Sequence, residues 1–160
     1  MRRTWRRVAY FHGRRLGQTI PSLDQLNESI DKRVASGEQE DDVVLEVVED
    51  FERSAATVSA RTTPLVPASG IVVAGATFLA KDGDVDSTIV AALAIGLALL
   101  GIGFLAMSVF THAGRPNVGL PPTRVDIAFV HMRLTKKETS AQAGSFFSLV
   151  GFVVLLLAIL

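Results

Sequence analysis

Residues 87–110 read STIVAALAIGLALLGIGFLAMSVF, which is twenty-four consecutive positions without a charged side chain. A helix needs about 20 mainly apolar residues to cross the hydrocarbon core of a bilayer. The stretch is also longer and more apolar than an ordinary buried helix. It therefore predicts a transmembrane helix, and the rest of the chain is interpreted around it.

Two further apolar stretches lie on either side of this one. Residues 62–80 carry no charge and would form ~28 Å of helix, about one hydrocarbon thickness. Residues 139–160 are uncharged as well, so the sequence ends in a third apolar stretch. We therefore predict an all-α membrane protein with three transmembrane helices, at about residues 64–80, 87–110 and 141–160, and with a loop at 111–140.

Short segments mark the ends of the first two spans. Pro64 and Pro67 fall at the start of the first span, where a missing backbone N–H costs little. Residues 81–86, KDGDVD, form a turn too short for anything but two antiparallel helices. The first two spans are therefore expected to form a hairpin.

The segment before the third span is polar and begins with glycine and proline. Thr123 and Asp126 then have the spacing of a helix-capping pair. Val125, Phe129 and Met132 share one face of the helix that would follow. This pattern predicts an amphipathic helix at the membrane surface, either separate from the third span or continuous with it.

Residues 1–63 hold 21 of the 32 charged side chains, and we treat them as a cytoplasmic basic tail and helical hairpin, distinct from a membrane domain at 64–160. Residues 1–20 form either a helix on an anionic membrane surface or a flexible positive tail. The basic residues expected at the membrane surface are Arg2, Arg3, Arg6, Arg7, Arg14, Arg15, Arg133, Lys136 and Lys137.

A capping pair and the spacing of apolar residues predict the helical hairpin. Ser22 and Gln25 have the spacing of a capping box, and Leu26 and Ile30 continue the helical pattern. Residues 36–42 are expected to form a loop, and a second amphipathic helix begins at Val43. The apolar stripes pack against each other, against a second copy or the membrane-proximal helices, or against a cytoplasmic partner protein that binds residues 22–60.

Positive charge near the spans predicts the orientation. Ten Lys and Arg residues precede the first span and five lie within 111–138, whereas the turn at 81–86 carries only Lys81. We therefore expect a multi-pass protein of the bacterial cytoplasmic (inner) membrane, with the N-terminus in the cytoplasm and the C-terminus outside.

Few residues suit catalysis or ligand binding. No ionisable side chain lies within the spans, which argues against ion-coupled transport. The chain has no cysteine, and His12, His112 and His131 lie too far apart for a metal-ligand motif. Asp82, Asp84 and Asp86 begin like a calcium loop but lack its later residues. We expect no enzyme, cofactor or metal site, and no nucleic-acid partner.

Small residues recur at helical spacing in all three spans. Such faces allow helix backbones to approach closely in lipid, where van der Waals contact drives association. They pack the three spans of one subunit together, or they form an interface between subunits. The candidate helix-packing residues are Gly70, Ala74, Ala92, Gly96, Ala141, Gly144, Ser148 and Gly151.

The layout of residues 50–160 resembles a known family. A helix with a basic residue enters the first span (FERSAATVSARTTPL), a Gly-Arg-Pro loop follows the second (HAGRPNVG), and a lysine pair precedes the third (TKKETSAQAGSFFSLVGF). This is similar to the small transmembrane effector domains of cyclic-nucleotide antiviral defence systems, the Pycsar- and SLATT-type effectors. The resemblance implies an oligomer that impairs the inner membrane when activated.

Two functions are therefore expected. The first is a non-enzymatic membrane protein that acts on proteins or the bilayer through helix–helix assembly, with the lipid bilayer and a second copy of itself as partners. The second is the membrane-perturbing effector that the resemblance implies.

Overall fold

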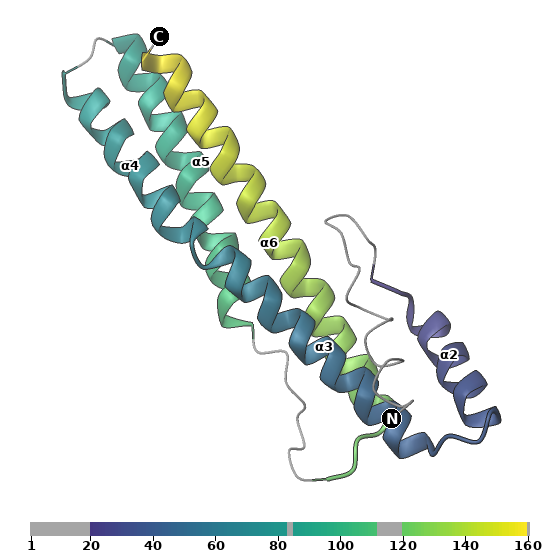
Figure 1. The fold of residues 1–160 in the computed structure, drawn as a ribbon. Helices are drawn as coiled ribbons and strands as arrows, with labels where there is room; N and C mark the ends of the chain where they lie inside the picture. The colour runs from purple at the N-terminus through teal and green to yellow at the C-terminus, as the bar shows by residue number, and fades with distance from the viewer. Residues whose placement is uncertain (1–19, 83–84, 112–119, 160) are drawn as a thin grey trace, which may run out of the picture. The chain divides into compact units, whose positions relative to one another are not determined.

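The computed structural model describes residues 20–82, 85–111 and 120–159, and all the regular structure in these ranges is helical (Figure 1). The helices are α2 (Leu23–Ala35), α3 (Glu40–Thr62), α4 (Leu65–Asp82), α5 (Val85–Phe110) and α6 (Arg124–Ile159). The chain forms two compact units, one from residues 1–51 and 115–131 and the other from residues 52–114 and 132–160. We call them the first and the second unit.

The first unit contains the predicted helical hairpin. The capping box is confirmed, since Ser22 Oγ accepts from the Gln25 backbone N–H at 3.3 Å and Gln25 Oε1 accepts from the Ser22 N–H at 3.0 Å. Leu26 and Ile30 of α2 are buried, as are the α3 residues Val43, Val44, Val48 and Phe51. Gly37, at φ 95°, lies in the turn between the two helices.

The turn is shorter than the sequence predicted. Residues 40–42 were expected in the loop, but α3 begins at Glu40. Its first turn therefore carries Glu40, Asp41 and Asp42. Negative side chains are favourable there because the unpaired N–H groups give the helix N-terminus a partial positive charge.

Two arginines bind the first unit together through carboxylates. Arg33 of α2 bonds to Glu38 and, at 2.8 Å, to Glu46 of α3. Arg124, the first residue of α6, bonds at 2.7 Å to both Asp31 and Glu40. The hydrogen bonds that Arg33 donates to the carboxylates of Glu38 and Glu46 raise the pKa of Arg33, so its charge persists across the working pH range.

The second unit contains the membrane-spanning helices. Three helical stretches are long and apolar enough to cross a bilayer, and they lie within residues 40–81, 88–110 and 124–157. The predicted all-α membrane protein with three spans is therefore confirmed. α4, α5 and α6 lie side by side, with the end of α4, the start of α5 and the end of α6 at the same end of the bundle (Figure 1).

The third span and the helix before it form one continuous element. α6 runs over 36 residues, so residues 124–140, assigned above to a loop that contains a surface helix, are helical throughout. Asp126 Oδ2 accepts hydrogen bonds from the backbone N–H of Thr123 at 2.8 Å and from its hydroxyl at 2.9 Å. The Thr123–Asp126 pair thus marks the start of α6, and no glycine or proline interrupts the helix before residue 144.

The capping box provides a direct test of the first unit. Ser22→Ala removes the acceptor for the Gln25 N–H and should cost about 1 kcal/mol of local stability in α2. Hydrogen–deuterium exchange of the full chain in detergent should show faster exchange in the first turn of α2, with α5 unchanged. Ser22→Asp, which restores an acceptor, should exchange as slowly as the wild type; equal exchange of Ser22→Ala and wild type would contradict the prediction.

Candidate assembly surface

On the face of α6 that points into the bundle, buried residues recur every three or four positions. Its members in the second unit are buried or half-buried, and they are Leu134, Lys137, Ala141, Gly144, Ser148, Gly151 and Leu155. Alternating steps of three and four keep a seam on one side of a helix. We call this face the inner seam of α6.

The inner seam approaches α5 most closely at two glycines. A Cβ atom built on Gly144 would lie 2.8 Å from the backbone N of Leu105 and 3.0 Å from the carbonyl O of Gly101. A Cβ atom on Gly101 would lie 3.0 Å from the backbone N of Ser148 and 3.1 Å from the carbonyl O of Gly144. Because backbone atoms are among the nearest neighbours of each built Cβ, neither helix has room for a side chain here.

The seam continues toward the end of α6 with small residues on both sides. A Cβ atom on Gly151 would lie 3.3 Å from both the Ala94 carbonyl O and the Ala98 N of α5. Ala94 and Ala98 are fully buried. Leu155 joins a core cluster with Val72 and Ala76 of α4, so all three spans meet at this level.

A hydrogen bond between hydroxyl groups connects the first and third spans. Ser69 Oγ and Ser148 Oγ lie 2.7 Å apart, and Ser69 Oγ is also 2.9 Å from the Leu65 carbonyl O of its own helix. Ser69 is 1% exposed. Such a bond orients one helix against another in lipid, where no water competes for it.

Four of the predicted helix-packing residues lie on the inner seam, and four do not. Ala141, Gly144, Ser148 and Gly151 face the interior of the bundle. Gly70 and Ala74 of α4 and Ala92 and Gly96 of α5 are exposed. No atom lies within 4 Å of a Cβ built on Gly70 or Gly96.

The exposed side of α5 has its own repeat, spaced four, three, four, three, four and three residues apart. It consists of Ile89, Leu93, Gly96, Leu100, Gly103, Met107 and Phe110, all exposed. Gly103, like Gly96, has open space where a Cβ would stand. We call these seven residues the outer stripe of α5. It lies opposite the buried face of α5, which carries Ala91, Ala94, Ala98, Gly101 and Leu105.

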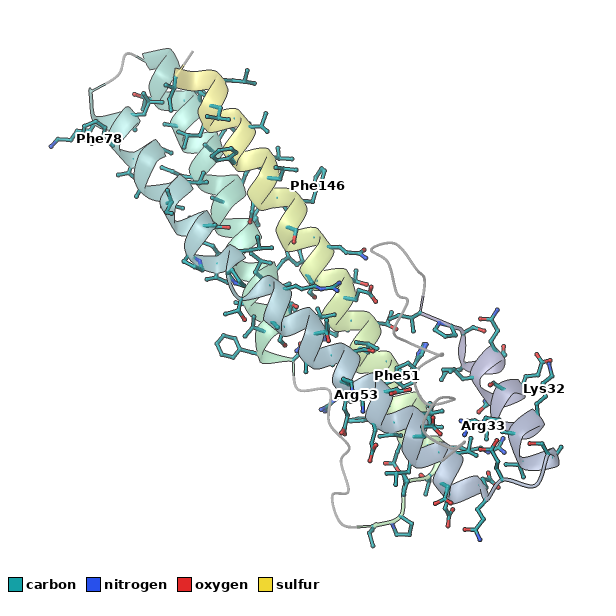
Figure 2. All side chains as sticks on the ribbon, viewed as in Figure 1. Lys32, Arg33, Phe51, Arg53, Phe78 and Phe146 are labelled. Atoms are coloured by element: carbon teal, nitrogen blue, oxygen red, sulfur yellow. The ribbon has the colours of Figure 1, made fainter. Side chains whose placement is uncertain are left out.

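The outer stripe has two open glycines, whereas the exposed side of α4 has one, Gly70, and the exposed side of α6 has none among the described residues. Figure 2 shows Phe78 of α4 and Phe146 of α6 projecting away from the bundle, and they are 72% and 62% exposed. A face that combines the 3.5-residue period with glycines allows a second helix to approach closely. The outer stripe is therefore the candidate assembly surface.

Comparison with models of protein families, with curated proteins and with solved structures finds nothing similar to this chain. The candidate function therefore rests on the geometry of the chain itself.

The predicted basic residues fall into three groups. Arg2, Arg3, Arg6, Arg7, Arg14 and Arg15 lie outside the described residues. Lys136 is exposed and Arg133 is half-buried, and their place at a membrane surface stays a prediction. Lys137, by contrast, lies on the inner seam, and its Nζ donates to the Thr111 carbonyl O at 3.0 Å.

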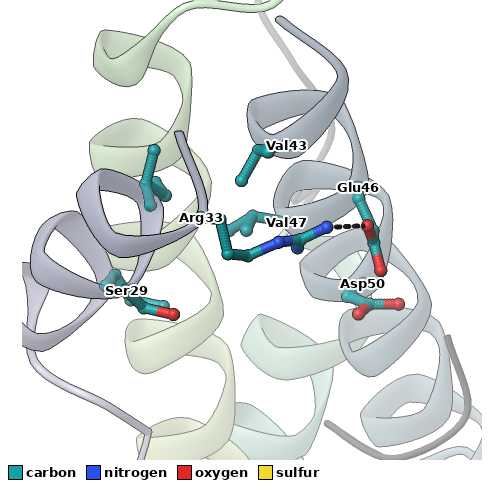
Figure 3. Close-up of a pocket in the computed structure, with 8 residues that line it drawn as sticks. Ser29, Arg33, Val43, Glu46, Val47 and Asp50 are labelled. Atoms are coloured by element: carbon teal, nitrogen blue, oxygen red, sulfur yellow. Dashed lines mark hydrogen bonds and ion pairs between the residues drawn. The ribbon is translucent and has the colours of Figure 1, made fainter. Parts of the chain in front are cut away.

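The first unit holds a small pocket between α2 and α3 (Figure 3). Leu26, Ile30 and Val43 form its apolar walls, and Arg33 and Glu46 form an ion pair in its wall. Its cavity volume of about 30 Å³ has room for a water molecule or two and not for an organic ligand. Arg33 is already paired with two carboxylates. The pocket is therefore a packing feature of the hairpin.

Of the three histidines, only His131 lies within the described residues. His12 and His112 lie outside them. The Nε2 atom of His131 lies 2.8 Å from the Pro21 carbonyl O, and its ring packs edge-on against Phe51 at 5.8 Å. Within residues 20–82, 85–111 and 120–159, no three His, Asp or Glu side chains are placed to hold a metal ion. The contacts of His131 are therefore those of a side chain that packs within the first unit.

Sequence reasoning did not identify the α5 residues that meet the inner seam. Ala91, Ala94, Ala98 and Gly101 are spaced three, four and three apart, as are Ala141, Gly144, Ser148 and Gly151. Because the two sets of small residues have the same spacing, the sequence could have predicted that these faces of α5 and α6 pack against each other. The burial of Lys137 had no signal in the sequence, since a lysine before a span is usually exposed to headgroups.

The same substitution can be made at a buried glycine of the inner seam and at an exposed glycine of the outer stripe. Gly144→Ala should destabilise the bundle by about 1–3 kcal/mol, because its methyl group would meet the α5 backbone. Gly96→Ala should be neutral or slightly stabilising, since its Cβ meets no atom and alanine favours a helix. Reversible unfolding in mixed detergent micelles measures both, and equal free energies of unfolding for the two variants would contradict the assignment of the seam.

Proposed function

We propose that this protein is a non-enzymatic integral membrane protein that acts by assembling with a second copy of itself through the outer stripe of α5. One observation carries the proposal. α5 uses one face fully within the subunit and presents on the opposite face a second 3.5-residue repeat with Gly96 and Gly103 open. Two such stripes can meet as a coiled-coil-like pair with close backbone contact at the glycines.

The composition of the three spans favours helix packing over catalysis or ion transport. Between Leu65 and Ala80, Thr88 and Phe110, and Thr139 and Ile159 the sequence has no ionisable side chain. The hydroxyl groups of Ser69, Thr77 and Ser145 bond to their own helix backbone. Helix packing is therefore the interaction that these segments are equipped for.

The hairpin of the first unit suits a different kind of contact. Apart from Leu23, its large apolar side chains are buried or half-buried, and the charged side chains that α2 and α3 expose are mainly acidic, including Asp24, Glu28, Asp41 and Glu49. A cytoplasmic partner that binds residues 22–60 would therefore meet a negative surface and would itself be basic.

The same outer stripe would serve the alternative function. If copies associate through α5, a larger assembly can perturb the membrane, which is what the resemblance to antiviral effector domains implies. Expression with a measurement of membrane potential distinguishes the two functions. Depolarisation that is lost in Gly96→Leu supports the effector, and unchanged potential with intact assembly supports the interaction protein.

The absence of cysteine allows a clean test of the assembly surface. Single-cysteine variants at Leu93, Leu100 and Met107 should form disulfide-linked dimers in membranes, because these positions would face each other across the interface. Ala98→Cys, on the buried face of α5, should not cross-link. Phe146→Cys is the matched lipid-facing control. Cross-linking at Leu93 no stronger than at Phe146 would contradict the proposal.

We also propose the orientation that positive charge implies, with the N-terminus and residues 111–123 in the cytoplasm and Leu160 outside, in the cytoplasmic membrane. Reporters fused after Leu160 and inserted within 111–122 should show opposite sidedness. Activity of both reporters on the same side would contradict a three-span arrangement with this orientation.

A further inference from the structure

Lys137 has an unusual environment at the end of the inner seam. Its side chain is 4% exposed, and the acceptor for its Nζ is the Thr111 carbonyl O at 3.0 Å. An ammonium group has three N–H donors. Among the residues that the structure describes, Lys137 has no carboxylate partner and no second acceptor, so two donors remain unused. Lys137 lies two residues before the uncharged stretch that begins at Thr139.

A second unused polar group comes from α5. Ser108 is 0% exposed, and its hydroxyl has no hydrogen-bond partner in the described part of the chain. It lies one helical turn before Thr111, whose carbonyl binds Lys137. Ser140, which is 8% exposed, lies three residues after Lys137 on α6. Ser108 and Thr111 lie one turn apart on α5, and Lys137 and Ser140 lie one turn apart on α6, so these polar groups are all within a turn of the contact between Lys137 and Thr111.

These groups favour an anionic ligand. A buried ammonium is costly unless an opposite charge pairs with it, and the described residues supply none. Capping the last carbonyls of α5 would use one donor, and an exposed lysine would suffice for it. Arg133 and Lys136 lie on the same stretch of α6 and add positive charge at this end of the span.

A phosphate group matches this chemistry best. Its several oxygen atoms can accept from an ammonium and a hydroxyl at once, and charge-assisted bonds of this kind are strong. Basic pockets between transmembrane helices on the cytoplasmic side commonly bind lipid headgroups. We propose that Lys137, together with Ser108, binds a phosphate group at the end of the α5–α6 seam. The outer stripe of α5 plays no part in this site.

The experiment uses the full chain purified in a maltoside detergent, which has no phosphate. Native mass spectrometry measures the retention of added phosphatidylglycerol and of galactosyl diacylglycerol, which has similar tails but no phosphate. The wild type should retain phosphatidylglycerol and not the galactolipid. Lys137→Gln keeps a donor for the Thr111 carbonyl but loses the charge, so retention should fall about tenfold or more.

Matched variants separate binding from folding. Lys136→Gln removes the neighbouring exposed lysine and should change retention less than about twofold. Lys137→Arg restores the charge and should restore binding, whereas Ser108→Ala should weaken it several-fold because it removes one hydroxyl. Circular dichroism of each variant verifies that the helices persist.

Inorganic phosphate distinguishes the two sources of the ligand. If phosphate alone raises the unfolding temperature of the wild type but not of Lys137→Gln, the site takes free phosphate. If only phosphatidylglycerol is retained in a Lys137-dependent manner, the ligand is a lipid headgroup. The proposal is overturned if Lys137→Gln and Lys136→Gln behave alike with both probes, or if the galactolipid is retained as well as phosphatidylglycerol.

Discussion

The close approach of α5 and α6 at Gly101 and Gly144 is the constraint on which the rest of the second unit depends. The backbones meet where neither residue has a side chain, so α6 can lie against α5 in one register. That register places Ser148 at 2.7 Å from Ser69, which positions α4, and it leaves Lys137 beside the Thr111 carbonyl at the end of α5. In lipid such contacts matter because van der Waals packing, not exclusion of water, holds helices together.

The two faces of α5 differ in their packing. Its buried face is made of alanine, glycine and leucine, and it is used completely within the subunit. Its outer stripe repeats the same 3.5-residue period with Gly96 and Gly103, and no part of the chain that the structure describes packs against those two glycines. An apolar helix of this kind has no polar face to indicate its orientation, so packing alone decides which side remains available.

In the first unit, ion pairs fix how the helices lie against one another. Arg33 connects α2 to α3 through Glu46, and Arg124 connects the start of α6 to Asp31 and Glu40. Exposed ion pairs contribute little free energy, so the buried residues Ile30, Val43 and Phe51 supply most of the stability. The ion pairs fix the register of helices whose apolar contacts are non-directional.

The sequence by itself determined the all-α class, the three spans and the capping box at Ser22, because hydropathy and capping act over a single turn or span. It also identified Gly144 and Ser148 as small residues on one helix face. Only the tertiary structure decided that this face packs inside the subunit while Gly70 and Gly96 remain open, and that Lys137 is buried while Lys136 is exposed. The physical reason is that a nearly uniform apolar helix has no amphipathic signal, so its rotation depends on which backbone atoms of a neighbouring helix it can approach.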